Sequence, residues 1–470
     1  MERLRGFDAA FLHMERGDVQ MHTLKVLVVD PARLGRPLAL EDVHRAIEGH
    51  LDAYPRARQI VVAAPLFGGR PFWVSDPRFT LAAHLTERTV AAPGGQAELD
   101  AVLSELASQP LDRSRPLWDL TLVHGLAHGR QGLVVRLHHA ISDGVGAINA
   151  FAAMTREEPG AVVAPSAEGS IGAAPSRAEL FARAARDVGP WLGELPRFFK
   201  DVSESNRKNQ VYRAEAKHLP PVGFGAGPSF TTKPVGAARR CATGNLALAD
   251  FERVKNAFGV TMTAAVQAVL AGALRREQLR RGEEAKGPLI TTFGVAIDRA
   301  SARLWGNEVT ATFAHLAVHM GDPVERLRAT AASTQEAIAL VRHLGTDMAG
   351  RWSEYLPRLP HVIGRRMAYK TKNTLYHVGT ASVRGPSRTR WLGPVEVVEW
   401  YSLAALAHPP ALHICAYSYV DRMSIGILTA PEIYDRPRRL LEDMEDSLAE
   451  LVSLAHRTDE APGDVSTAAG

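Results

Sequence analysis

The sequence His138-His139-Ala140-Ile141-Ser142-Asp143-Gly144 stands between two segments with different patterns. Residues 131–137 are rich in β-branched and aliphatic side chains, which predicts a strand that ends at the two histidines. Residues 145–154 have apolar side chains at helical spacing, which predicts a helix with Ser142 or Asp143 as its N-cap. The histidines therefore lie at the carboxyl end of a strand, where open α/β sheets form their ligand crevices.

Successive residues of a strand point to opposite faces, so His138 and His139 cannot both face the same cavity. We expect one imidazole to pack inside the domain and the other to reach a substrate. A neutral imidazole is the usual general base near neutral pH. Asp143 has three candidate roles, which are pairing with a cation, orienting an imidazole and capping the helix. The competing interpretation is that both histidines are hydrogen-bonded structural groups, because a short motif is only a hypothesis.

The complete string resembles the His-His-x-x-x-Asp-Gly signature of the chloramphenicol acetyltransferase-like superfamily. That superfamily includes condensation domains of nonribosomal peptide synthetases and bacterial wax ester synthase/diacylglycerol acyltransferases. The upstream segment Pro110-Leu111-Asp112-Arg113-Ser114-Arg115-Pro116-Leu117-Trp118 is similar to the second of these families. So is the opening Phe7-Asp8-x-x-Phe11-Leu12, followed by Glu15 and Met21-His22, which condensation domains lack.

The resemblance implies an α/β fold of two chloramphenicol acetyltransferase-like domains with mixed sheets and an active site between them. It implies transfer of a fatty acyl group from acyl-CoA, as co-substrate, to diacylglycerol or a long-chain alcohol. His139 would be the general base, and no acyl-enzyme is needed because no Gly-x-Ser-x-Gly elbow accompanies it. By the same resemblance, Asp143 holds the loop through a cation. Gly144 allows close approach of backbone or substrate.

Other residues are expected to support the site. On pattern alone Trp118 is a core residue, since large aromatics dominate cores, and Pro116 and Leu117 flank it at the start of a strand. Asn307, in the retained Gly-Asn pair of the family, is a candidate donor to the oxyanion of the tetrahedral intermediate.

Two motifs of the second half depart from the family pattern. Thr263-Ala264 stands where the family usually carries Asn-Asp, and Ala381-Ser382-Val383-Arg384-Gly385-Pro386 replaces Ser-Asn-Val-Pro-Gly-Pro. These changes leave the base in place but alter groups that should border the acceptor. An acyltransferase for the hydroxyl or amine of a specialised metabolite is therefore the alternative. A non-catalytic protein that binds lipid or an acyl carrier is the rival from another class.

Composition sets the wider limits. A chain of 470 residues exceeds a single hydrophobic core, which indicates two domains. The formal charge of +4 is too small to indicate nucleic-acid binding. Two cysteines support neither a disulfide framework nor a cysteine-rich metal site, which suits a reducing cytoplasm. No apolar run approaches the roughly 20 residues that span a bilayer, so attachment to the inner membrane face or to lipid inclusions would be peripheral.

The expected organisation is a first domain at 1–155, a linker at 156–228, a second domain at 229–457 and a disordered tail at 458–470. Strands around Val395–Tyr401, Leu412–Tyr419 and Met423–Leu428 should complete the second sheet. Alternation places His315 and His319 on one strand face, but with no further ligand nearby we expect no metal site. A basic cluster at Arg365, Arg366, Lys370 and Lys372 is either a solvated face or a contact for CoA phosphates or anionic lipid.

The linker carries an amphipathic stripe, interrupted by Pro190 and Pro196, which should kink or divide the helix. We expect this stripe to be buried in a crossover helix packed on the two domains. The alternative is an interfacial helix that lies on lipid. The stripe consists of Leu180, Phe181, Ala184, Val188, Trp191, Leu192, Leu195, Phe198, Phe199 and Val202.

Overall fold

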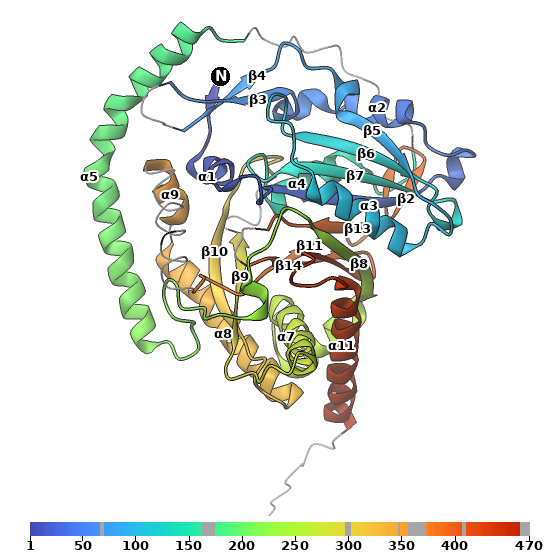
Figure 1. The fold of residues 1–470 in the computed structure, drawn as a ribbon, viewed down its shortest axis with the longest axis vertical. Coiled ribbons are helices and arrows are strands. Elements are labelled where there is room, and N and C mark those ends of the chain that lie inside the picture. The colour runs from blue at the N-terminus through green and yellow to red at the C-terminus, as the bar shows by residue number, and fades with distance from the viewer. Residues whose placement is uncertain are drawn as a thin grey trace, which may run out of the picture.

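The computed structural model contains two α/β halves joined by one long helix (Figure 1). It describes residues 1–65, 70–160, 174–296, 302–345, 348–355, 366, 373–406 and 410–460. Each half is built on a six-stranded mixed sheet, and a three-stranded sheet adds to the first half. The expected two-domain α/β class with mixed sheets is therefore confirmed.

The first sheet has the strand order β12-β13-β2-β7-β6-β5. Strands β2 (His22–Asp30) and β7 (Gln131–His138) lie at its centre and pair in antiparallel register. Strand β6 (Trp118–His124) is antiparallel to β7, and β5 (Leu85–Thr89) is parallel to β6 at the edge. Sequence patterns predict β7 and the start of β6. They miss β5, because four of its five residues are exposed and polar.

The remaining strands form the small sheet and the second large sheet. The small sheet has the order β1 (Glu2–Arg3), β4 (Phe72–Ser75) and β3 (Gln59–Val62). The second large sheet has the order β10 (Val309–Leu316), β9 (Leu289–Ala296), β11 (Val378–Arg384), β14 (Leu412–Tyr419), β15 (Arg422–Thr429) and β8 (Arg240–Ala247). Strand β11 is parallel to both of its neighbours, and the other pairs are antiparallel.

Two strands of the second half belong to the first sheet, and for the one at 395–403 the expectation is wrong. Strand β13 (Val395–Leu403) pairs with β2, and β12 (Arg390–Leu392) pairs with β13. The alternating pattern of β13 identifies a strand but contains no information about its partner, since partner choice is a tertiary contact. The exchange ties the two halves together at the level of the backbone.

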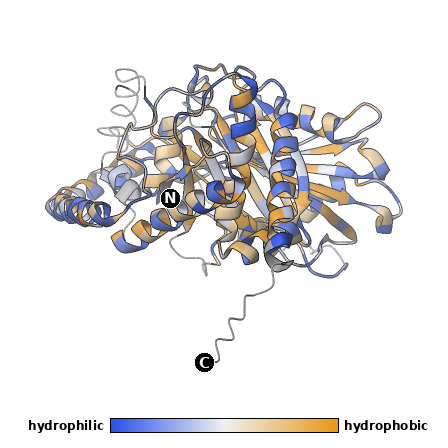
Figure 2. Cartoon of the chain, turned by 90° about the horizontal axis from the view of Figure 1, so that it is seen from below, coloured by the Kyte–Doolittle hydropathy of each residue, from blue (hydrophilic) through white to orange (hydrophobic). Residues whose placement is uncertain are grey.

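Helices cover the sheets on their apolar faces. Those of the first half are α1 (Gly6–Met14), α2 (Leu40–Glu48), α3 (Gln96–Ser108) and α4 (Gly144–Met154). Those of the second half are α6 (Leu248–Phe258), α7 (Met262–Arg280), α8 (Pro323–Leu344), α9 (Met348–Tyr355) and α11 (Pro437–Glu460). Figure 2 shows the hydrophobic colour concentrated on the strands inside these layers. Helix α11 runs to Glu460, so the expected disorder is wrong for the first three residues of the tail at 458–470, and the rest of that tail, 461–470, lies outside the described residues.

The centre of the second half is α7, which is apolar on nearly every side. Its residues from Ala264 to Leu274 are buried between the sheet, α8 and α11. A helix without a polar face is stable only when it is surrounded in this way. In the described residues no single helix is long and apolar enough to cross a membrane. Helices α6 and α7 reach that length and apolar composition only when they are taken together, and they are bent by 103° at the break between them.

The long connecting helix is α5 (Arg177–Glu215), which spans 39 residues. It begins at a capping box between Ser176 and Glu179 and runs from the small sheet past α9 to α8. Figure 1 shows it curving along the outer edge of the molecule. Pro190 and Pro196 were expected to kink or divide the helix, and division is wrong because α5 is continuous through both. Both prolines are exposed, so water can replace the hydrogen bonds that they remove.

The expected burial of the α5 stripe is also wrong for four of its ten residues. Leu180, Ala184 and Phe198 are buried against the body of the protein. Four other stripe residues are solvent-exposed, namely Phe181, Val188, Leu192 and Phe199. Helical spacing alone marked all of them as one apolar set, and only the packing of α5 divides them.

Candidate active site

The histidine pair lies where the sequence places it, at the junction of β7 and α4. The Asp143 side chain caps α4, because its Oδ1 accepts a hydrogen bond from the Gly146 N–H at 3.0 Å. The two imidazoles differ in exposure: His138 is fully buried, whereas His139 is partly exposed. The expected division of the pair into an inner and an outer side chain is therefore confirmed.

The imidazole of His139 is held by Asn307, which comes from the second half of the chain. Asn307 Oδ1 lies 3.1 Å from His139 Nδ1. The Asn307 amide nitrogen donates to the His139 carbonyl oxygen at 2.8 Å and to Asp8 Oδ1 at 2.7 Å. Because two oxygens fix the NH₂ group of this amide, its oxygen must face the ring. Nδ1 therefore carries the proton, and the lone pair is on Nε2.

Two further contacts fix the plane of the His139 ring. Phe11 on α1 stacks on the imidazole, with ring centroids 4.0 Å apart and planes 15° apart. The His139 backbone N–H donates to the Met21 carbonyl at 2.7 Å. Among the described residues Nε2 has no hydrogen-bond partner. The site thus presents an unprotonated ring nitrogen on a side chain that cannot easily turn.

Burial sets the protonation states of this network. It lowers the pKa of His139 to about 4, so the ring is neutral near pH 7. Burial raises the pKa of Asp8 to about 7, against the opposing effect of the Asn307 N–H. Either protonation state of Asp8 leaves an oxygen that can accept the Asn307 hydrogen bond. The Asn307 amide therefore keeps its orientation across the neutral range.

His138 has a separate, internal set of partners. Its Nδ1 accepts the Ala140 N–H at 3.0 Å, so its proton is on Nε2. Nε2 lies 3.6 Å from Glu15 Oε1, in the opening motif. Burial lowers the pKa of His138. Burial alone would raise the pKa of Glu15, but His138, Met21 and Arg113 together bring it below its usual value.

Asp143 joins the loop to the second half of the chain. Its Oδ2 accepts from Arg303 Nη2 at 2.5 Å and from the Glu308 N–H at 2.9 Å. The cation expected beside Asp143 is thus Arg303, and the side chain also fulfils the capping role. The backbones continue the contact, because the Gly306 N–H donates to the Ile141 carbonyl at 2.7 Å. Residues 303–308 form a strap across the loop, and this strap carries Asn307.

Gly144 lies under a tyrosine of the second sheet. A Cβ atom added at Gly144 would lie 2.7 Å from Tyr417 Oη and 3.5 Å from Val383 Cγ2. A larger residue would therefore push the two halves apart, which accounts for the glycine by close approach. Val383 belongs to segment 381–386, whose sequence differs from the family pattern, so that segment does border the loop.

The Pro116-Leu117-Trp118 segment supports the site from behind. All three residues are buried. Trp118 Nε1 donates to the Ala57 carbonyl at 2.9 Å, and its ring stacks on His84, which confirms it as a core residue. The Leu117 carbonyl accepts the His138 N–H at 3.0 Å. This segment therefore fixes the strand end from which the histidines project.

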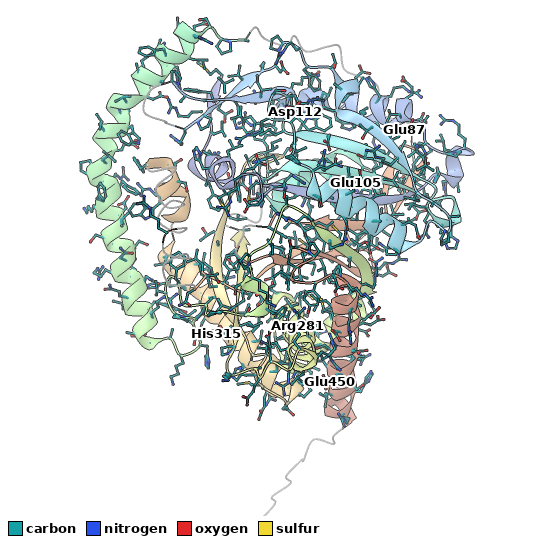
Figure 3. All side chains as sticks on the ribbon, viewed as in Figure 1. Glu87, Glu105, Asp112, Arg281, His315 and Glu450 are labelled. Atoms are coloured by element: carbon teal, nitrogen blue, oxygen red, sulfur yellow. The ribbon has the colours of Figure 1, made fainter. Side chains whose placement is uncertain are left out.

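Other sequence signals lie away from the loop. His315, labelled in Figure 3, is on β10, but that strand ends at Leu316, so His319 lies in the following turn and not on the same strand face. Thr263 and Ala264 form the first turn of α7 behind the second sheet. Of the basic cluster at 365–372, only Arg366 is among the described residues.

A buried polar cluster beside the loop was missed by sequence reasoning. Lys25 Nζ on β2 donates to Ser402 Oγ on β13 at 2.6 Å and lies 5.4 Å from the centre of the Tyr417 ring. No described carboxylate forms a salt bridge with Lys25, and burial lowers its pKa. Cys415 and His413 lie on the same face of β14, where burial raises the pKa of the thiol to about 11. The available signal was one lysine inside an apolar strand.

Comparisons with known proteins match both halves of the chain to one family. Residues 4–266 match the wax ester synthase/diacylglycerol acyltransferase catalytic domain, and residues 305–452 match the C-terminal domain of the same proteins. A Mycobacterium tuberculosis H37Rv protein assigned as a diacylglycerol O-acyltransferase is 31% identical over 479 aligned positions, covering 99% of this chain and 100% of its own. A second protein of that strain, with the same assignment, is 30% identical over 448 positions and covers 94% of each chain.

Solved structures show the same fold. The wax ester synthase/diacylglycerol acyltransferase from Marinobacter aquaeolei VT8 superposes with a TM-score of 0.68 at 22% identity, over 97% of this chain and 100% of that chain. The starter condensation domain of rhizomide synthetase, in a mutant form bound to C8-CoA, superposes with a TM-score of 0.57 at 15% identity, over 97% and 95% of the two chains.

Proposed function

This chain belongs to the wax ester synthase/diacylglycerol acyltransferase family and is an acyltransferase, and we propose that it transfers a fatty acyl group from acyl-CoA to the hydroxyl of a diacylglycerol or a long-chain alcohol. The observation that carries the proposal is Nε2 of His139, which has no hydrogen-bond partner among the described residues, on a ring whose other nitrogen is fixed by Asn307. A condensation domain of the same fold binds C8-CoA, which supports an acyl-CoA donor.

In the proposed reaction His139 acts as general base and then as general acid. Nε2 takes the proton of the acceptor hydroxyl as its oxygen attacks the thioester carbonyl. The tetrahedral intermediate then loses the CoA thiolate as the C–S bond breaks, and the imidazolium returns the proton to that sulfur. The products are an ester and free CoA. No acyl-enzyme forms, and no metal or resident cofactor takes part in the proposal.

Asn307 and Asp8 support this cycle as positioning residues. While Nε2 carries the transferred proton, the ring is positively charged, and the Asn307 oxygen faces its Nδ1–H. Asp8 lies behind the amide and polarises it, an effect that is strongest when the carboxyl is ionised. Both hydrogens of the Asn307 amide already have acceptors. We therefore propose that Asn307 orients the base and does not stabilise the oxyanion.

The experiment that tests the function is a screen of acceptors with palmitoyl-CoA. Free CoA thiol is measured with and without 1,2-dioleoylglycerol, hexadecanol and polar hydroxyl or amine acceptors, and products are identified by mass. We expect thiol release that depends on the acceptor, with a matching ester, in the wild type and not in His139→Ala. A folded wild-type protein that releases no thiol with any acceptor, but binds palmitoyl-CoA, would favour the non-catalytic lipid-binding alternative.

A second candidate acceptor class is favoured by Lys25. A buried ammonium group without a carboxylate partner is costly unless a ligand satisfies it, and this one lies next to the Tyr417 ring that faces Gly144. A polar acceptor could satisfy it, whereas hexadecanol has no group for this purpose beyond its reacting hydroxyl. Lys25→Met should then raise KM for polar acceptors only. An equal fall in kcat with every acceptor would instead assign Lys25 to the oxyanion.

The cytoplasm is the proposed location. The two cysteines, Cys241 and Cys415, are both buried and free, so neither contributes a disulfide. Burial raises the pKa of both thiols, which makes them inert at neutral pH. Free thiols of this kind are compatible with a reducing compartment. Fusion to a redox-sensitive or compartment-specific reporter, with fractionation of the expressing cells, tests the location.

A further inference from the structure

We propose that the outer face of α5 is a docking surface for an anionic lipid bilayer. This inference does not depend on the acyl-transfer reaction, because it concerns a surface on the helix that connects the two halves. It rests on three observations about α5, which concern its exposed apolar residues, its acidic residues and its basic residues.

The exposed apolar residues of α5 form a single line. Phe181, Leu192 and Phe199 are 51%, 52% and 54% exposed, and Val188 between them is 38% exposed. Their spacings of 7, 4 and 7 residues place all four within an arc of about 40°, at about 100° per residue. Four of the nine large apolar side chains that are exposed in the described residues therefore lie on one stripe of one helix. Single exposed apolar residues are ordinary, but a continuous line of them marks an interaction surface.

The face of α5 toward the protein is a different one. Phe198 is fully buried and packs on Tyr355 of α9, with ring centroids 4.4 Å apart. It lies about 100° around the helix from the exposed stripe. The stripe is therefore not an extension of the contact with the body, and the helix has spare apolar surface after its intramolecular packing is complete.

The acidic residues in the central part of α5 all face the body. Asp187 accepts from Arg3 Nε at 2.7 Å, and Glu194 accepts from the Tyr355 hydroxyl at 2.6 Å. Asp201 pairs with Arg351. These carboxylates are engaged in contacts with the first half and with α9, so they add no negative charge beside the stripe.

The basic residues of the same part face outward. Arg186, Arg197 and Lys200 are exposed, and no described carboxylate forms a salt bridge with any of them. They lie at about 100° to 160° from the stripe, on the side away from the body. Their long side chains can reach back along the helix while their charges stay in the headgroup region. Lys200 thus flanks the stripe, and Arg186 and Arg197 reach toward it from farther around the helix. An apolar stripe with cations on its solvent side, none paired with a described carboxylate, is the pattern of a helix in the interface of an anionic membrane.

Figure 1 shows that this face is accessible, because α5 follows the outer edge of the molecule. In Figure 2 the helix mixes hydrophilic and hydrophobic residues along its length, in contrast to the apolar strands inside. A second copy of the chain would require a partner surface with acidic groups matched to the cations. A bilayer of anionic lipid supplies both requirements, namely apolar depth and negative charge, without such a match.

The test compares matched variants on the full chain in the absence of acyl-CoA. Leu192→Gln/Phe199→Gln removes the stripe, and Arg197→Gln/Lys200→Gln removes cations. Val211→Gln is the apolar control, because Val211 is 53% exposed on the same helix but lies about 120° from the stripe. Arg328→Gln on α8 is the charge control. Each protein is sedimented with vesicles of phosphatidylcholine, with and without phosphatidylglycerol, at low and high salt.

We expect the wild type and both controls to bind the vesicles that contain phosphatidylglycerol. The stripe variant should lose roughly tenfold or more in affinity, since two apolar side chains leave the interface. The cation variant should lose the part of binding that falls with salt. Melting temperatures and turnover of a short, water-soluble acyl-CoA and alcohol should not change.

Two results would overturn the proposal. The first is a wild type that binds no vesicle, or a stripe variant that binds as well as the wild type. The second is a wild type that is dimeric by light scattering and becomes monomeric in the stripe variant, which would assign the stripe to contact between copies. Neither result bears on acyl transfer, which is measured separately with soluble substrates.

Discussion

Two segments meet at the imidazole of His139, and they differ in how they contribute to the site. The loop 138–144 carries the reactive side chain and caps α4 through Asp143. The strap 303–308 carries no candidate base, but it supplies Arg303 to the loop aspartate and Asn307 to the ring. The comparison teaches that one half of the chain provides the reacting atom and the other half determines its tautomer and its position.

The largest effect should follow the loss of the ring itself. His139→Ala removes the proposed base, so turnover should fall by roughly 10²–10⁴-fold with the melting temperature maintained. The matched comparison is His138→Ala, which leaves the Ala140 N–H without its acceptor and should cost about 1–3 kcal/mol of stability. Turnover and thermal unfolding are measured for both. Wild-type turnover in folded His139→Ala would contradict the mechanism.

A smaller loss should follow removal of the strap's contact with the ring. Asn307→Ala frees Nδ1 and permits the wrong tautomer, so kcat should fall by about 10–100-fold, the range for partners that orient a histidine, with little change in KM. Asp8→Asn is the conservative control, because its amide oxygen can still accept the Asn307 N–H, and it should retain most activity. A rise in KM with unchanged kcat would mean that Asn307 contacts substrate instead.

Separating the strap from the loop should affect stability more than chemistry. Asp143→Ala removes one of the two carboxylates that pair with Arg303, leaving Glu308, and removes the cap of α4, so unfolding free energy should fall by roughly 3 kcal/mol. Asp143→Asn should lose less, because the amide oxygen still caps the helix. Denaturant unfolding and kcat are compared for the two variants. Unchanged stability with a collapsed rate in Asp143→Asn would show that the aspartate acts directly on the imidazole.

The smallest effect on kcat/KM is expected from a change in pH near neutrality. Because the pKa of His139 is lowered to about 4, the base stays neutral above pH 5.5 and kcat/KM should fall steeply only toward pH 4. Between pH 5.5 and 8 only a small change is expected, from the ionisation of Asp8, whose pKa is raised to about 7. The contribution of this histidine to folding stability changes with pH in the same direction as kcat/KM. It is fully present above the unfolded pKa of about 6.5 and is lost as pH falls through the folded value. Initial rates and unfolding curves over this range provide the measurement. An acid limb centred near pH 6.5 would show that the ring is solvated in the working enzyme.

Much of the first half could be predicted from local pattern. The β-branched pattern predicted the strand β7 that ends at the histidines, and the apolar spacing after the loop predicted α4. These signals are local, because alternation and helical periodicity follow from backbone geometry alone. The opposite placement of His138 and His139 follows from the same alternation. The cation beside Asp143 was expected, but its identity as Arg303 was not.

The sequence by itself determined the family, the two-domain α/β class, the position of the histidine pair and the core role of Trp118. Only the tertiary structure decided that β13 pairs with β2 and that Asn307 faces the ring with its oxygen. It also decided that Lys25 is buried with no salt bridge to a described carboxylate, and that α5 exposes four of the ten residues of its apolar stripe. The physical reason is the range of the interactions. Periodicity and capping act over a few residues, whereas each of the other features is fixed by groups that are far apart in the chain and meet only when the two halves pack together.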